Sequence, residues 1–295
     1  MTTIGIELSA AEPSPASARR QALRAALGNP IGAVGAFGAL LLLFAAAFGP
    51  LLAPYDPLDQ NILARFAEPS AQHWLGADEY GRDMFSRILY ASRASILIAL
   101  SSVVVSLLTG VALGVVAAYR GGVLDALLSE TANILLAFPT VVVGILVLVS
   151  LGPGSANVVV ALAISFIPRF IRLARAEALS IMQRNFIEAA RAAGASGLRI
   201  MARHILPNVI GTAVVSGALW TATALRAEAT LSFLGLGVPL PWPSWGNLVA
   251  DGMPNMFSNA DLVLYPCLAI VFAVVSFNML GDALRDYFDP RLVGR

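Results

Sequence analysis

The chain has 295 residues and a formal net charge of +1, with 58% hydrophobic and 13% charged residues and a mean hydropathy of +0.77. Soluble domains usually carry about a quarter charged residues, so this composition excludes an ordinary soluble globular protein, and the near-zero net charge gives no reason to expect a nucleic-acid partner. All 19 cationic residues are arginine; without lysine the chain can neither hold a Walker A ATPase site nor form a Schiff base.

Apolar segments about 20 residues long, the length that crosses a bilayer, recur along the chain and predict an all-α polytopic membrane protein with six transmembrane helices. Residues 1–29 are polar and then basic, and we interpret them as a cytoplasmic tail. A first span and an external loop are expected over 30–93, and a core domain of five spans over 94–285, followed by a cytoplasmic tail at 286–295. The six spans are expected at 31–53, 94–118, 127–151, 156–170, from 207 to between 225 and 231, and at 262–281.

Two places within these spans are candidates for the lining or gate of a pathway. Phe138 and Pro139 interrupt the third span; proline removes a backbone hydrogen bond and predicts a kink. Arg226 and Glu228 lie near the end of the fifth span, where an ionisable residue is costly and points to function. For these two residues a structural role at the interface stays open, and their spacing of two puts them on different helix faces, so no direct pair is expected.

The arginines also predict the orientation. If the N-terminus lies in the cytoplasm, most of them fall on cytoplasmic segments, whereas the reverse orientation would place the excess outside. The positive-inside rule therefore predicts a multi-pass membrane protein with both termini in the cytoplasm.

A basic segment over about 169–206 separates the fourth and fifth spans, on the predicted cytoplasmic side. Its alanine-rich stretches favour helix, and glycines at Gly194 and Gly197 predict a bend between two short helices. The small residues before the bend would let a helix approach a partner closely, which favours a docking surface. A basic connector lying on anionic lipid remains an alternative.

The same segment resembles the coupling loop of ABC importer permeases. The pattern is Glu188-Ala189-Ala190, then Gly194, then Leu206-Pro207. His204 stands where the general pattern has isoleucine, a departure typical of the dipeptide/oligopeptide branch. Three further stretches resemble the C-type subunit of that branch, so that the resemblance covers about residues 30–290. They are His73-Trp74-Leu75-Gly76-Ala77-Asp78 with Gly81-Arg82-Asp83 and Ser86-Arg87; Leu231-Ser232-Phe233-Leu234-Gly235-Leu236-Gly237; and Pro243-Ser244-Trp245-Gly246.

This resemblance implies a type I ABC importer permease architecture in a bacterial inner membrane. It implies a heterodimer with a homologous permease, two cytosolic ATPases that use ATP and Mg, and an extracytoplasmic binding protein that delivers the solute. This chain itself is then expected to have no catalytic residue, no metal site and no bound cofactor. The residues to which the resemblance gives the coupling role are Glu188, Ala189, Ala190, Arg191, Ala193, Gly194, Ala195, Ser196, His204, Leu206 and Pro207.

The expected function is a permease for dipeptides or oligopeptides, without ATP hydrolysis of its own. Glutathione, nickel complexes or oligosaccharides are alternative solutes within the same branch. A secondary transporter is less favoured because five of the spans contain almost no charge. An intramembrane enzyme would need a nucleophile with a base, or a metal cluster, and the sequence offers no such grouping.

Overall fold

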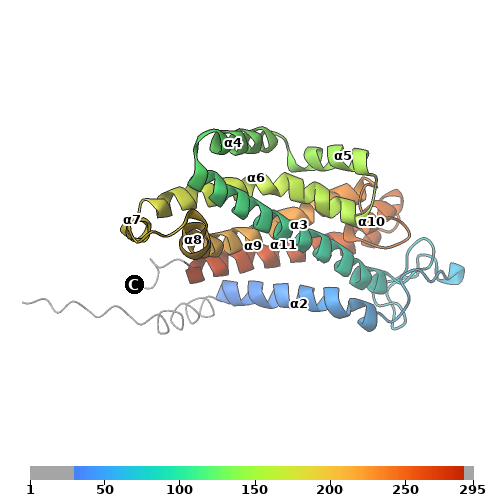
Figure 1. Ribbon diagram of the computed structural model, residues 1–295. Helices are drawn as coiled ribbons and strands as arrows, with labels where there is room; N and C mark the ends of the chain where they lie inside the picture. The colour runs from blue at the N-terminus through green and yellow to red at the C-terminus, as the bar shows by residue number, and fades with distance from the viewer. Residues whose placement is uncertain (1–29, 289–295) are drawn as a thin grey trace, which may run out of the picture.

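The computed structural model describes residues 30–288, and within that range it is helical, with one isolated bridge between Ala77 and Asp83 and no strand. Five long helices run along the molecule side by side (Figure 1). Four of them surround α3, which packs chiefly on α6 and also on α9 and α2, while α11 packs on α9 and α2. The bounds of the five are α2 (Pro30–Leu52), α3 (Met84–Arg120), α6 (Ser155–Met182), α9 (Leu206–Phe233) and α11 (Asp261–Phe288). The all-α prediction is confirmed.

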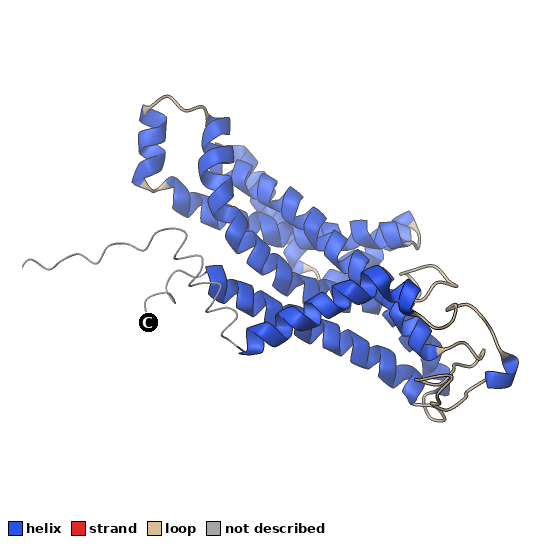
Figure 2. Cartoon of the chain, turned by 90° about the horizontal axis from the view of Figure 1, so that it is seen from below, coloured by secondary structure: helices blue, strands red, loops and turns tan. Residues whose placement is uncertain are grey.

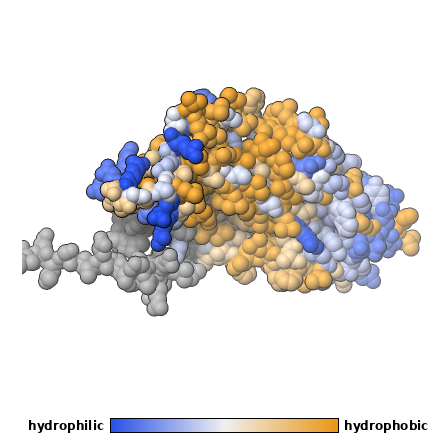
Figure 3. Space-filling model, viewed as in Figure 1, coloured by the Kyte–Doolittle hydropathy of each residue, from blue (hydrophilic) through white to orange (hydrophobic). Residues whose placement is uncertain are grey.

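These helices are long and apolar enough to cross a membrane, with α9 counted together with the turns that precede it from Gly197. A band of hydrophobic residues covers the middle of the molecule, between hydrophilic groups at its two ends (Figure 3). Most of the long loops gather at one of these ends (Figure 2).

The predicted third span is broken in two. Helix α4 (Gly122–Ala137) and helix α5 (Thr140–Leu151) meet at 98°. Pro139 occupies the N-cap position of α5, where its missing N–H costs nothing, so the proline ends one helix and starts another. The prediction of a kink at Phe138-Pro139 is confirmed, and the pair counted as one span gives six candidate spans by length and composition.

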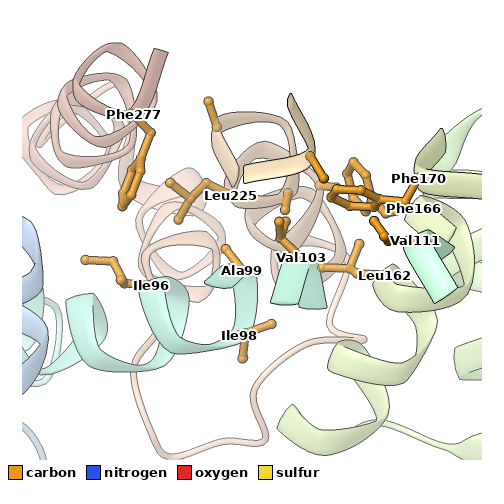
Figure 4. Packing of buried hydrophobic residues seen from close by; sticks show 14 of the residues in the cluster. Ile96, Ile98, Ala99, Val103, Val111, Leu162, Phe166, Phe170, Leu225 and Phe277 are labelled. Carbon is orange, nitrogen blue, oxygen red and sulfur yellow. The ribbon is translucent and has the colours of Figure 1, made fainter. Parts of the chain in front are cut away.

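The core lies where α3, α6 and α9 meet. Phe166 and Phe170 of α6 are fully buried beside Val111 and Leu162 (Figure 4). Phe170 also meets Trp220 of α9 edge to face, with ring centroids 4.5 Å apart, a favoured aromatic geometry. The close contact of α3 with α6 is possible because a side chain at Gly110 would collide with the backbone and side chains of α6.

Several helix ends differ from the predicted bounds. Helix α3 begins at Met84 rather than near residue 94, because Asp83 caps it by accepting a hydrogen bond from the backbone N–H of Ser86 at 2.8 Å. Helix α6 continues past residue 170 to Met182 and carries the first arginines of the predicted basic segment. Helix α11 continues to Phe288, past the predicted start of the C-terminal tail. The tail predicted over 1–29 lies outside the described residues.

A further helix, α10 (Trp245–Gly252), lies in the stretch predicted as a loop between the last two spans. Ser244 caps it by accepting from the backbone N–H of Asn247 at 3.2 Å. The prolines at 239, 241 and 243 predict irregular backbone but end before this point. Helix α10 packs on α11, α9 and α3, at the end of the molecule where the loops gather (Figures 1 and 2).

Candidate functional site

The basic segment between α6 and α9 folds as two short helices with a bend, as predicted. Helix α7 (Asn185–Ala192) ends in a turn at Gly194, whose φ of +77° suits glycine. Two backbone hydrogen bonds close the turn, from Gly194 to Arg191 at 2.9 Å and from Ala195 to Ala190 at 3.0 Å. Ser196 then caps α8 (Gly197–Ile200). The bend is therefore a defined structure and not a loose loop.

Helix α7 presents small and charged side chains to its surroundings. Among the described residues, Ile187 is its one buried side chain, and it joins the main hydrophobic core. The predicted coupling residues form the surface of α7 and of the turn behind it. Of these, Glu188, Ala189, Arg191, Ala193, Gly194 and Ser196 are exposed, while Ala190 and Ala195 are half-buried. One apolar anchor thus fixes a short helix whose remaining surface is free for a partner.

Helix α8 does not end before the fifth span but continues into it. A single turn of π-helix, Met201–Ile205, joins α8 to α9, and the whole stretch Gly197–Phe233 has 37 residues. Pro207 lies in the first turn of α9 and lacks an N–H. The side-chain amide of Asn208 donates to the carbonyl of His204 at 2.6 Å in the same turn. Helix α9 begins at Leu206, in agreement with the prediction that span five begins near Pro207, and the π-helical turn joins it to α8 in one helical stretch.

His204 links the two halves of this segment. Its ring lies 6.2 Å from the ring of Phe186 on α7, centroid to centroid. His204 and Leu206 are half-buried, and Pro207 is exposed. The side chain that replaces the general isoleucine is thus placed to hold α7 against the start of α9.

At the break between α4 and α5, Phe138 and Pro139 are both exposed. The break is held from α6: Arg169 donates to the hydroxyl of Thr140 at 2.9 Å, and its guanidinium lies over the ring of Phe166, 4.6 Å from the centroid. Ser165 donates to the carbonyl of Thr140 at 3.4 Å. The pathway candidates at this break therefore lie on a free surface with a fixed backbone.

Arg226 and Glu228 lie on different faces of α9, as their spacing predicted. Arg226 is exposed and donates to the hydroxyl of Thr223 at 3.3 Å. Glu228 has no exposed surface and accepts a hydrogen bond from Ser232 at 2.7 Å. No ion pair joins them. Their predicted place in a pathway stays a prediction.

A buried cluster of charges lies at the opposite end of the molecule from α7. Asp78 accepts from Arg82 at 2.7 Å and from Arg87 at 2.5 Å, and Arg87 also donates to Asp251 of α10 at 3.0 Å. His73 lies 2.9 Å from a carboxylate oxygen of Asp83. All these contacts lie within the chain. Asp251 gave no sequence signal, because its partner is 164 residues away.

Comparisons with known proteins place these features in a family. Residues 110–294 match the family described as binding-protein-dependent transport system inner membrane component. Residues 17–69 match the N-terminal TM domain of oligopeptide transport permease C.

Among curated proteins, the chain is 38% identical to the dipeptide transport system permease protein DppC of Alkalihalophilus pseudofirmus, over 92% of this chain and 90% of that protein. It is 35% identical to DppC of Bacillus subtilis, over 90% of this chain and 83% of that protein. It is 39% identical to the glutathione transport system permease protein GsiD of Pectobacterium atrosepticum, over 86% of this chain and 85% of that protein. The chain therefore belongs to the family of binding-protein-dependent transport system inner membrane components and is a multi-pass membrane permease.

Proposed function

We propose that this chain is one of two permease subunits of an ATP-driven peptide importer. It pairs with a homologous permease, and an extracytoplasmic binding protein delivers the peptide. Two cytosolic ATPases, which bind ATP and Mg, hydrolyse the nucleotide, while this chain binds no cofactor. The observation that carries the proposal is the continuity of the α7 surface with a membrane-spanning helix through α8 and the π-helical turn.

The shape of the α7–α8 segment suits an ATPase partner. The exposed alanines allow close approach, and Glu188 and Arg191 add charges of both signs to the same short helix. Anionic lipid would favour a uniformly basic surface, so the carboxylate and the small residues favour a protein partner. The coupling role of the residues from Glu188 to Ser196, with His204, Leu206 and Pro207 at the base of α9, belongs to this proposal.

The α7–α8 segment is rigid enough to transmit a displacement from α7 to α9. The buried Ile187 side chain and the contact between Phe186 and His204 hold α7 to the bundle. A displacement of α7 by an ATPase is therefore passed to α9, because no flexible linker lies between them within the described chain. We infer that this movement opens and closes the pathway, with Phe138, Pro139, Arg226 and Glu228 as candidates for its lining or gate.

The proposal also fixes the orientation. The α7–α8 end carries many of the arginines, which the positive-inside rule places in the cytoplasm. Both chain termini then lie in the cytoplasm, and α10 with the 55–83 loop lies outside, where a binding protein arrives.

Peptide is the proposed solute, because two of the similar proteins are named for dipeptide transport. The GsiD relative is named for glutathione transport, and glutathione is the second candidate. Both are short molecules with amide bonds and free carboxylates, so the two candidates need the same kind of pathway.

The test is reconstitution of the copurified complex in liposomes. The proposal expects uptake of a labelled dipeptide only when ATP and the binding protein are both present, and expects loss of uptake when the ATPase is inactivated. Uptake by the purified chain alone would overturn the proposal. Uptake of glutathione without any uptake of dipeptides would replace the first candidate solute by the second.

A further inference from the structure

Glu228 is a buried acid of α9 that has no part in the proposed contact between α7 and the ATPases. Its side chain has no exposed surface, and one of its carboxylate oxygens has no hydrogen-bond partner among the described residues. A buried acid costs stability that an apolar residue of similar size would avoid. A buried acid inside a membrane-spanning helix therefore indicates a functional role.

The contacts of Glu228 join three helices. Ser232, one turn further along α9, donates to it at 2.7 Å. Ser95 of α3 also lies beside the Glu228 side chain. The Ser95 hydroxyl accepts from the backbone N–H of Trp245, the first residue of α10, at 3.2 Å. A hydroxyl that accepts one hydrogen bond still has its own proton to donate, so Ser95 lies between the start of α10 and the Glu228 carboxylate with a donor for it.

Close packing reinforces this cluster. A side chain at Gly246 of α10 would lie 2.7 Å from the Cβ of Ser232 and even closer to the backbone of Ala229. Trp245 also donates through its ring to the carbonyl of Ile88 at 3.2 Å. The two sequence motifs around residues 231–237 and 243–246 thus meet at the Glu228–Ser232–Ser95 cluster.

Helix α10 is therefore tied to the bundle at both ends. Its start is held by the cluster, and its end by the ion pair of Asp251 with Arg87. The stretch Gly197–Phe233, which carries Glu228 near one end, reaches the coupling segment at the other. At about 1.5 Å per residue this stretch is about 55 Å long, enough to link the two faces of a membrane.

We propose that Glu228 is a positioning residue that fixes α10 to α9, so that α10 moves as one body with the coupling segment. A movement at α7 then reaches the outer surface of the permease, where α10 faces the arriving binding protein. This inference rests on the importer function proposed above and adds to it a route by which the two faces communicate.

The first experiment measures the proposed rigid body directly. Spin labels are placed at Ile210→Cys near the base of α9 and Met253→Cys just after α10, both exposed positions, with Cys267→Ser to remove the native thiol. The inference expects one narrow distance distribution that does not change between nucleotide-free and ATP-bound complexes, and a broadened distribution in Glu228→Leu. A wild-type distance that changes with ATP would overturn it, as would an unchanged distribution in Glu228→Leu.

The second experiment measures function in the reconstituted complex. Glu228→Leu should lower the stimulation of ATP hydrolysis by peptide-loaded binding protein by at least about tenfold, because the carboxylate oxygen that accepts from Ser232 is lost. Glu228→Gln should restore stimulation, because its amide oxygen still accepts from Ser232. The matched control is Thr230→Val on an exposed face of the same helix, which should leave stimulation unchanged.

These outcomes separate the two proposals. Absence of stimulation in the wild type would contradict the importer function, whereas normal stimulation in Glu228→Leu would contradict only the role of Glu228. The spin-label comparison without nucleotide needs no transport activity and tests the inference in either case. If Glu228→Leu does not assemble, Ser95→Ala removes the hydroxyl that accepts from the Trp245 N–H without changing a charge, and it carries the same expectations.

Discussion

Arg87 and Asp251 meet across 164 residues of sequence, with 3.0 Å between a guanidinium nitrogen and a carboxylate oxygen. The first residue lies near the start of α3 and the second near the end of α10. Arg87 also donates to Asp78, so one buried guanidinium joins the loop behind the first span to the helix in front of the last one.

Replacing Arg87 should therefore destabilise this end of the protein. Arg87→Met keeps the apolar stem and removes the charge, so that the buried Asp78 carboxylate loses one of its two guanidinium partners. Loss of one member of a buried pair typically costs about 3 kcal/mol or more. We expect a lower midpoint of thermal unfolding in detergent, followed by intrinsic tryptophan fluorescence. Arg93→Met, an exposed arginine of the same helix, is the control and should leave the midpoint unchanged.

The turn at Gly194 gives a second prediction, for coupling. Gly194→Pro cannot adopt a φ of +77° and loses the backbone hydrogen bond to Arg191. Peptide uptake should be lost although the protein still inserts into the membrane and pairs with its partner permease. Gly194→Ala, which strains the turn by only about 1 kcal/mol, should retain part of the uptake.

Glu188→Lys tests the docking surface without changing the backbone. The exposed carboxylate becomes a cation on an already basic segment, so we expect weaker binding of the ATPases in a pull-down assay and little uptake. Arg184→Ala, at the exposed position before α7, serves as the control for a change of charge outside the motif. Normal uptake in Glu188→Lys would refute the role of this residue.

Strong local signals made part of this structure predictable. Pro139 disfavours a continuous helix, and Gly194 supplies a backbone angle that other residues avoid, so the broken span and the bend were both predicted from single residues. The membrane spans were predicted because the apolar segments are as long as a helix that crosses the bilayer. The family motif around Glu188 added the expected role of the bend.

Charged and proline-rich stretches were harder to predict. Arg169 and Arg175 belong to the predicted basic segment and lie on α6, where Thr140 and Asp125 supply partners that the sequence does not reveal. Helix α10 was missed because its capping residue, Ser244, follows a run of prolines. The burial of Glu228 was missed for the same reason as the pair of Arg87 with Asp251: both depend on contacts between residues far apart in the chain.

The link between α4 and α6 leads to a prediction for local stability. Asp125 accepts from two nitrogens of Arg175, at 2.5 and 2.6 Å. The pair is partly exposed, so its removal should cost about 1 kcal/mol or less. We expect Asp125→Asn to increase hydrogen exchange in α4 while exchange in α9 stays the same. Equal exchange in α4 of both proteins would show that packing alone holds this helix.

The break between α4 and α5 allows the last prediction. Thr140→Val keeps the size of the side chain and removes the hydroxyl to which Arg169 donates at 2.9 Å. The guanidinium then has its contact with the Phe166 ring but no bond to the start of α5, so the angle between α4 and α5 becomes less fixed. Because the exposed Phe138-Pro139 corner is a candidate for the pathway lining, we expect a lower maximal rate of peptide uptake at an unchanged affinity of the binding protein. Thr109→Val is the matched control, since the Thr109 hydroxyl bonds only within its own helix α3. Uptake that is equally slow in both variants would mean that the loss of any hydroxyl in the bundle is harmful, and the break would then have no special part in transport.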